Sequence, residues 1–182
     1  MNAAGSIVPE GIVKVDTAAG MLSLGDLAVP CAIGRGGTCM ANAKQEGDGC
    51  TPLGSWPIRA AMFRHGRSAP PQGITLPWRW ILPSDGWSDA PEDAAYNRPV
   101  RLPHAFSAET LQRGDMLYDI IIVLDHNMSP PVPGMGSAIF FHLWNEEKPP
   151  QERTTEGCVA ISRDDMMRIL PALEPGMAMK IS

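Results

Sequence analysis

Residues 137–162 read SAIFFHLWNEEKPPQERTTEGCVAIS, and the fold predicted for the whole chain is built around this stretch. Residues 137–144 and 158–161 are apolar, whereas the segment between them is polar and contains proline. Short apolar runs bounded by turn-forming residues are typical of buried strands. We therefore predict two short strands that pair as neighbours in a sheet and are joined by a polar loop.

Two reactive side chains fall on these predicted strands. Side chains alternate between the faces of a strand, so His142 shares a face with Phe140 and Trp144, and Cys158 shares one with Ala160. One register of the pair brings the imidazole and the thiol together. A thiol beside an imidazole can lose its proton to it, and the thiolate is a strong nucleophile at neutral pH. The alternative is an inert buried cysteine and a structural histidine.

Three blocks of the sequence resemble the L,D-transpeptidase family, whose catalytic domain is of the YkuD type. Residues 155–159, TEGCV, preceded by residues 139–142, IFFH, are similar to the family's Ser/Thr-x-Gly-Cys turn with a histidine on the strand before it. Residues 44–54, KQEGDGCTPLG, resemble its Lys-x-x-Gly-Asp-x-x-Thr-Pro-x-Gly segment. The chain departs from many members at Glu156 and Ala160, where they have a histidine and an arginine.

The resemblance implies a fold and an acyl-enzyme mechanism. The expected fold is mainly β with one or two short helices, a YkuD-like β-sandwich with a helix after the nucleophile strand. By matching position Cys158 is the acylated nucleophile, and His142 is its proton donor and acceptor. We predict that the backbone N–H groups of Gly157 and Cys158 stabilise the oxyanion. Since no acidic partner for the histidine is evident, a backbone carbonyl is the candidate to orient its ring.

Four further residues are predicted to bind the substrate. Lys44 and Thr155 belong to the resembling blocks, and Trp144 shares the face of His142. Arg98 lies in an extended polar segment, and a guanidinium can hold a carboxylate by two parallel hydrogen bonds. We therefore predict that Arg98 recognises a carboxylate of the substrate.

The composition is that of a single globular domain over residues 1–182. Hydrophobic residues make up 44% and charged residues 19%, which excludes a disordered or polyelectrolyte chain. The 18 glycines and 18 prolines indicate many turns between short strands. The formal net charge of −5 argues against a nucleic-acid partner, because phosphate binding requires a basic surface. No apolar run is long enough to span a membrane.

The spacing of the cysteines and histidines does not predict a metal site, and cysteine acyl transfer requires no cofactor, so we expect neither. Cys39 and Cys50 could be bridged, but a reducing compartment favours free thiols. The N-terminus has neither the basic region nor the continuous apolar region of a signal peptide. This predicts a cytoplasmic protein, or a periplasmic one if a leader was removed.

The resemblance also implies the substrate, which is the stem tetrapeptide of peptidoglycan or a muropeptide that carries it. The bond cleaved lies between the L-centre of the third residue and the terminal D-Ala. In the cytosol the enzyme would meet soluble muropeptides, so we expect an L,D-carboxypeptidase that releases D-Ala in murein recycling. Two alternatives stay open: an exported transpeptidase that forms cross-links, and a non-catalytic muropeptide-binding or structural module.

Local patterns predict the remaining elements. Residues 5–33 should form short antiparallel strands, residues 118–124 a central strand, and residues 70–96 an irregular excursion. A short helix is expected from Ser107 to Gly114. After the nucleophile strand we expect a helix capped by Ser162 and then a last edge strand in residues 176–181.

Overall fold

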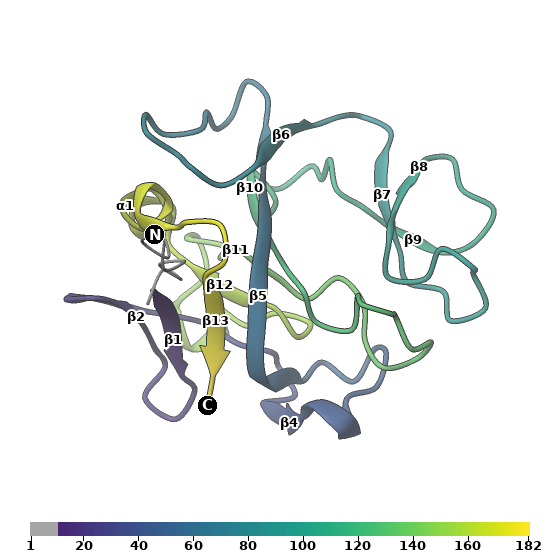
Figure 1. The fold of residues 1–182 in the computed structure, drawn as a ribbon, viewed down its shortest axis with the longest axis horizontal. Helices are drawn as coiled ribbons and strands as arrows, with labels where there is room; N and C mark the ends of the chain where they lie inside the picture. Colours follow the sequence, from purple (N-terminus) through teal and green to yellow (C-terminus); the bar gives the residue numbers. More distant parts are fainter. Residues whose placement is uncertain (1–10) are drawn as a thin grey trace, which may run out of the picture.

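The computed structural model describes residues 11–182, and strands dominate this part of the chain (Figure 1). The predicted mainly β fold class is confirmed. The strands are β1 (Ile12–Asp16), β2 (Met21–Leu24), β3 (Leu27–Pro30), β4 (Thr38–Met40), β5 (Thr51–Arg64), β6 (Trp78–Ile81), β7 (Asp85–Ser88), β8 (Pro99–Arg101), β9 (Ala108–Thr110), β10 (Ile120–Leu124), β11 (Phe140–Leu143), β12 (Val159–Ile161) and β13 (Ala178–Ile181). The helices are α1 (Arg163–Ile169) and the 3-10 turns η1 (Ala41–Ala43), η2 (Pro150–Glu152) and η3 (Leu170–Ala172).

The long strand β5 organises the main sheet and runs through the middle of the molecule (Figure 1). The strand order is β12-β11-β10-β5-β13-β1-β2-β3, and β4 and β6 also pair with β5. The first half of β5 pairs with β13 over residues 54–57, and the second half pairs with β10 over residues 58–63. Because β5 changes partners along its length, it joins two halves of the sheet.

One hydrophobic core lies between these halves. Val13 and Val15 of β1 belong to it, and so do Phe141 of β11, Val159 of β12 and buried residues of α1. Both halves therefore bury one face against the same core, as the layers of a sandwich do. The two ends of the strand order also meet, since an isolated bridge joins residue 32, just after β3, to residue 160 of β12.

The predicted pairing of the two key strands is confirmed. Strands β11 and β12 are parallel neighbours, with His142 opposite Ala160. The strands are shorter than predicted, and Cys158 lies directly before β12. Phe141 faces the main core, whereas Phe140 and Cys158 belong to a second buried cluster. The alternation of side chains thus separates the core residues from the reactive ones.

A three-stranded sheet with the order β8-β7-β9 lies apart from the main sheet, at the right of Figure 1. The helix predicted from Ser107 to Gly114 is wrong, because residues 108–110 form β9 and pair with β7. A partner strand thus overrides the local helix signal. Residues 70–96 are also more regular than predicted, since they contain β6 and β7.

The other predicted elements agree with the structure except at the C-terminus. Strands β1 to β3 are antiparallel neighbours, while residues 5–10 of that prediction lie outside the described residues. Every residue of β10 is buried, and β10 lies between β11 and β5. The Ser162 side chain accepts from the Asp165 N–H and caps α1 as expected. Strand β13 is not an edge strand, because it lies between β5 and β1.

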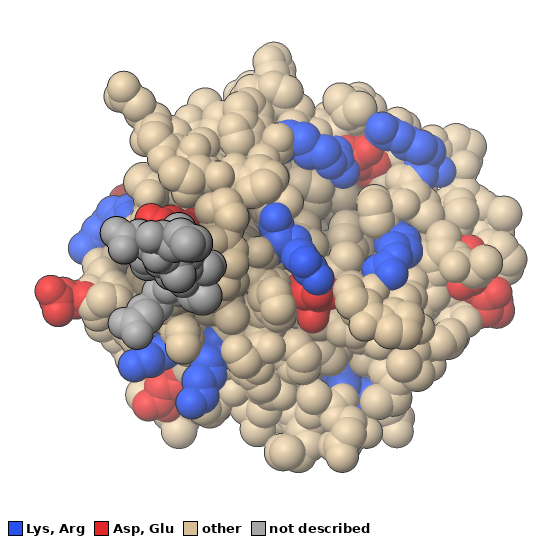
Figure 2. All heavy atoms as spheres, in the orientation of Figure 1, with Lys and Arg blue, Asp and Glu red and all other residues tan. Residues whose placement is uncertain are grey.

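Basic and acidic side chains are interspersed on the face drawn in Figure 2, with tan surface between them. Several of the surface arginines are paired with carboxylates, such as Arg59 with Asp125 and Arg35 with Glu156. Among residues 11–182, none of the helices has the length and apolar character needed to cross a membrane.

Candidate active site

A pocket of about 660 Å³ opens beside β11 and β12. Among the predicted site residues, its lining includes Lys44, His142, Trp144, Thr155 and Cys158. The nucleophile and base candidates therefore face the same cavity. The rest of the lining comes from the loop before β5, from the small sheet and the segment after it, from residues 137–139 before β11, and from the loop between β11 and β12.

The Cys158 thiol is held by backbone groups. Its Sγ donates to the carbonyl of Ala138 at 3.2 Å and accepts from the N–H of Phe140 at 3.2 Å. The residue is 6% exposed. Burial raises the pKa of the Cys158 thiol to about 12, although the Phe140 N–H works in the opposite direction. The sulfur is thus protonated at neutral pH in the resting protein.

A backbone carbonyl orients His142. Its Nδ1 lies 2.7 Å from the Leu143 oxygen, and since a carbonyl only accepts, Nδ1 carries the proton. This tautomer leaves Nε2 with a free lone pair, which a general base requires. The ring also meets Tyr118 edge-on, with the centroids 5.1 Å apart. Burial lowers the pKa of His142 to about 4, so the imidazole is neutral at pH 7.

The resting pair is therefore a neutral thiol and a neutral imidazole. The sequence suggested a thiolate formed by proton transfer to His142, but desolvation disfavours both ions in this pocket. A dry, neutral pair can still transfer its proton during attack on a substrate carbonyl, because the charge then moves onto the substrate. Burial therefore delays the proton transfer until the thiol attacks the substrate, but the nucleophile and the base are still Cys158 and His142.

Thr155 shapes the turn that presents the nucleophile. Its Oγ1 donates to the carbonyl of Cys158 at 2.7 Å and accepts from the N–H of Gly157 at 3.1 Å. The Thr51 hydroxyl donates to the same Cys158 carbonyl at 3.4 Å. Thr155 lines the pocket, and these contacts make it a residue that positions the nucleophile.

Gly157 is required by the backbone. Its φ is +136°, and an added Cβ would lie 2.8 Å from the Cys50 carbonyl oxygen. A side chain at this position would therefore clash with the loop before β5. The predicted role of Gly157 in the oxyanion hole needs correction, because its N–H already donates to Thr155. The N–H of Cys158 remains as the candidate donor.

Lys44 and Trp144 reach the pocket in different ways. The Lys44 ammonium is 2% exposed and pairs with Asp48, and its Nζ also donates to the Gln45 carbonyl at 2.8 Å. Burial works to raise the pKa of Asp48, but the bonds from Lys44 and from two backbone N–H groups hold it below its ordinary value. The Arg153 guanidinium lies over the Trp144 ring, 4.6 Å from its centroid, in a cation–π contact.

Arg98 does not line the pocket, and its recognition of a substrate carboxylate stays a prediction. The Arg98 carbonyl accepts from the N–H of Ser88, which ties this segment to the end of β7. Its neighbour Asn97, at φ +54°, turns inward instead and accepts from the indole of Trp87. The arginines that do line the pocket are Arg113 and Arg153.

Sequence reasoning missed three carboxylates of the lining, which we call the acidic wall: Glu46, Asp89 and Glu109. In the small sheet Trp87 pairs with Glu109, and Asp89 follows Trp87 by two positions, so these side chains share one face. The Trp87 ring packs on Phe140, which turns this face towards β11. The register of β7 and β9 thus brings Asp89 and Glu109 to the pocket, and the loop before β5 brings Glu46.

The carboxylates of the acidic wall influence one another. Burial is the first cause that raises the pKa of Glu109, and the charges of Asp89 and Glu46 add to it. A hydrogen bond from the Tyr118 hydroxyl, at 2.7 Å, and the charge of Arg113 act against this rise. Glu46 accepts from the Tyr96 hydroxyl. The wall thus brings three carboxylates to a lining that also holds the basic residues Lys44, Arg113, Lys148 and Arg153.

Three buried polar atoms of the lining have no hydrogen-bond partner within residues 11–182: Asp89 Oδ1, Ser137 Oγ and Trp144 Nε1. Buried polar atoms are normally paired, so these three indicate positions where a bound molecule or water supplies the partner. They include two acceptors and two donors, since a hydroxyl is both. A peptide offers groups of both kinds.

The profile of the YkuD family, the L,D-transpeptidase catalytic domain, matches residues 10–181. Similar solved structures are Bd1075 of Bdellovibrio bacteriovorus (13% identity, TM-score 0.47), the helical cell shape determining protein Pgp2 of Campylobacter jejuni (12%, 0.49) and L,D-transpeptidase 1 of Mycobacterium tuberculosis (11%, 0.43). Each of the three matches covers 94% of this chain. In the same matches this chain covers 47%, 47% and 58% of the other proteins, so it spans about half of their length. No curated protein matches it in sequence.

Proposed function

Because the chain belongs to the YkuD family of L,D-transpeptidase catalytic domains, we propose that it transfers the acyl group of a peptidoglycan stem peptide through Cys158. The observation that carries this proposal is the place of Cys158 and His142 beside one pocket, on the same face of paired strands. The bond attacked is the L,D bond before a terminal D-Ala.

The resting protonation states define the first half of the reaction. Cys158 Sγ attacks the carbonyl carbon while its proton passes to His142 Nε2, because a thiol of high pKa ionises only as the new bond forms. The Cys158 N–H donates to the developing oxyanion. An imidazolium whose pKa is about 4 is a strong acid, so it protonates the leaving amine readily and D-Ala departs.

The second half regenerates the enzyme from the thioester. His142 Nε2 takes a proton from the acceptor, the acceptor attacks the thioester carbonyl, and the sulfur leaves and regains a proton. With water as the acceptor the protein acts as an L,D-carboxypeptidase. We propose hydrolysis as the first activity to measure, with soluble tetrapeptide-carrying muropeptides as substrates.

An amine acceptor is the second candidate, and the acidic wall favours it. Negative charge beside the nucleophile attracts a cation, and the side-chain amine of a second stem peptide is cationic at pH 7. The unpaired Asp89 Oδ1 and Ser137 Oγ supply acceptors for its N–H groups. The bound ammonium first gives one proton to a carboxylate of the wall or to water. The neutral amine then attacks the thioester carbonyl while His142 Nε2 takes its second proton, and Cys158 leaves and is reprotonated. The amide formed is a cross-link, which is transpeptidation.

The test measures D-Ala release from a free stem tetrapeptide, with and without a second peptide as amine acceptor. The parent should release D-Ala, Cys158→Ala should release none, and Cys31→Ala should match the parent, since Cys31 does not line the pocket. Intact-protein mass should show an adduct of a carbapenem-type β-lactam that only Cys158→Ala lacks.

The outcomes separate the three functions. Tripeptide as the product indicates a carboxypeptidase, and a dimeric peptide indicates a transpeptidase. If the parent released no D-Ala and formed no adduct, the proposal would fail and a non-catalytic muropeptide-binding module would remain. Fractionation of cells that express the full gene tests the expected cytoplasmic location.

A further inference from the structure

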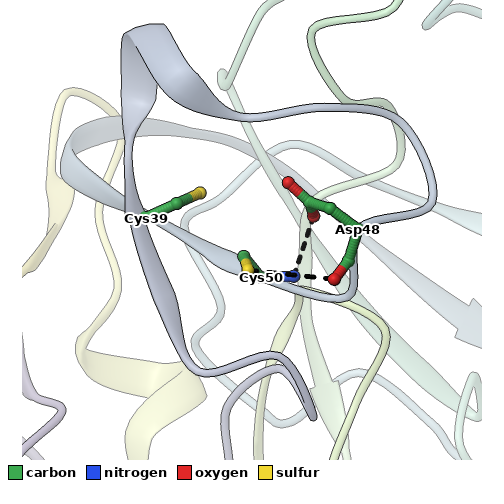
Figure 3. A group of neighbouring side chains, drawn as sticks. All are labelled: Cys39, Asp48 and Cys50. Carbon is green, nitrogen blue, oxygen red and sulfur yellow. Dashed lines mark hydrogen bonds between the residues drawn. The ribbon is translucent and has the colours of Figure 1, made fainter.

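Three potential ligands meet away from the nucleophile: Cys39, Asp48 and Cys50 (Figure 3). One sulfur or oxygen atom from each lies within 4.8 Å of the other two, and all three residues are partly buried. Cys39 comes from β4, and the other two come from the loop that leads into β5. In Figure 3 the side chains of Cys39 and Asp48 point towards each other, and Cys50 lies between and below them. The site lies where β4 meets β5.

The Asp48 carboxylate keeps room for another partner. Its Oδ1 accepts from the Lys44 ammonium and from the Cys50 N–H, and its Oδ2 accepts from the Gln45 N–H at 2.8 Å. A carboxylate offers about four lone-pair positions, so one on Oδ2 stays free. Asp48 can therefore bind a cation without giving up its bond to Lys44.

The charges around the cluster balance for a divalent cation. Two thiolates and one carboxylate carry three negative charges, a divalent cation carries two positive charges, and the buried Lys44 ammonium supplies the third. Buried charges are tolerated when they are paired in this way. The Gly36 carbonyl oxygen, 3.2 Å from Cys50 Sγ, or a water molecule can complete four ligands.

We propose that Cys39, Cys50 and Asp48 form a binding site for a divalent cation of the Zn²⁺ class. Thiolate ligands select soft and borderline metals such as Zn²⁺, and exclude Mg²⁺ and Ca²⁺, which prefer oxygen. Binding converts the two thiols into thiolates and releases two protons. Affinity must therefore weaken as the pH falls.

A metal at this site would affect the nucleophile indirectly, by fixing a segment that contacts the nucleophile turn. The Cys50 carbonyl oxygen packs against Gly157, and the adjacent Thr51 hydroxyl contacts the Cys158 carbonyl. A metal that ties Cys39 of β4 to Cys50 would fix the segment that supports the nucleophile turn. This role is structural, and the acyl transfer itself runs through Cys158 and His142.

The test uses the full chain with Zn²⁺ under a reductant that does not bind metal. After gel filtration the parent should retain about one Zn²⁺ per chain, whereas Cys39→Ser and Cys50→Ser should each lose it. Cys31→Ser is the matched control and should retain it, since its thiol lies outside the cluster. Zn²⁺ should also raise the melting temperature of the parent, and a chelator should reverse the rise.

Co²⁺ substitution in the parent keeps the test independent of how the variants fold. A thiolate-to-cobalt charge-transfer band in the near ultraviolet is expected, and it should disappear in the presence of excess Zn²⁺. The absence of this band, absence of bound Zn²⁺, or equal Zn²⁺ retention by Cys39→Ser and Cys50→Ser would each overturn the proposal. So would a disulfide between Cys39 and Cys50 that persists under the reductant. These readouts do not depend on acyl transfer, so the proposed function stands or falls separately.

Discussion

The pocket has two walls that hold their polar groups in opposite ways. On the strand wall, formed by Cys158 and His142, the hydrogen bonds are made with the backbone and the pKa shifts follow from burial. On the acidic wall, Glu109 contacts Arg113 and the Tyr118 hydroxyl. The strand wall thus holds a neutral thiol and a neutral imidazole, whereas the acidic wall holds carboxylates paired with side chains.

This difference suggests that the two walls have separate roles in acyl transfer. Backbone groups do not titrate, so they orient the thiol and the imidazole at any pH, and burial keeps both neutral until the substrate arrives. The acidic wall provides a charge that can select a cationic group of the substrate. The strand wall should therefore control the rate, and the acidic wall should control the choice of substrate.

The largest effect is expected from His142→Gln on the strand wall. The general base disappears while Cys158 stays, so kcat for D-Ala release should fall by roughly 10²–10⁴-fold. Steady-state rates on a free tetrapeptide measure this effect. A loss of less than about tenfold would mean that another residue is the general base and that the strand wall does not control the rate through His142.

The same residue predicts how stability depends on pH. The pKa of His142 falls from 6.5 to about 4 on folding, so between these values the unfolded chain binds a proton that the folded chain does not. The free energy of unfolding should therefore decrease as the pH falls through this range, by about 3 kcal/mol. The pKa of His126 is also lowered, first by burial, so the measured quantity is the difference between the parent and His142→Gln in urea unfolding. Equal slopes for both proteins would show that His142 is not desolvated.

Gly157→Ala tests the turn that carries the strand wall. The added Cβ meets the Cys50 carbonyl at 2.8 Å, and φ of +136° is strained for alanine. We expect a loss of about 2–3 kcal/mol in stability. Gly37→Ala is a suitable control, because its φ is also positive, at +75°, but its Cβ meets nothing within 4 Å. Equal losses in both variants would mean that backbone strain alone, and not packing against Cys50, requires Gly157.

Thr155→Val removes the two hydrogen bonds that fix the same turn and keeps the shape of the side chain. Each bond contributes about 1 kcal/mol, so the free energy of unfolding should fall by about 2 kcal/mol. Thr154→Val is the neighbouring control for stability, since Thr154 is exposed. Unchanged stability of Thr155→Val would contradict the role given to this hydroxyl.

The smallest effect is expected from Asp89→Asn on the acidic wall. Removing one of its charges should raise KM for an amine-bearing peptide about tenfold and leave kcat nearly unchanged, which corresponds to about 1.4 kcal/mol. Glu92→Gln is the control, because Glu92 is exposed and does not line the pocket. The same variants are then measured with a peptide whose side-chain amine is acetylated. If Asp89→Asn changed kcat instead, the acidic wall would act on the rate, and the separate roles given to the two walls would be wrong.

Features of the site that depend on local geometry could be predicted from the sequence. Alternation along each segment predicts that His142 shares a face with Phe140, opposite Phe141, and that Cys158 shares a face with Ala160, opposite Val159. The Ser162 cap of α1 is likewise local. These predictions required only the geometry of a single segment.

Other features depend on how distant segments pair and what they bury. The helix predicted at Ser107 became a strand because β7 offered a partner, and that register put Glu109 and Asp89 of the acidic wall on one face. The neutral state of the nucleophile pair follows from desolvation, which exists only after packing. By itself, then, the sequence determined which residues share a face; the tertiary structure decided which faces meet and lose water, because register and burial are properties of several segments at once.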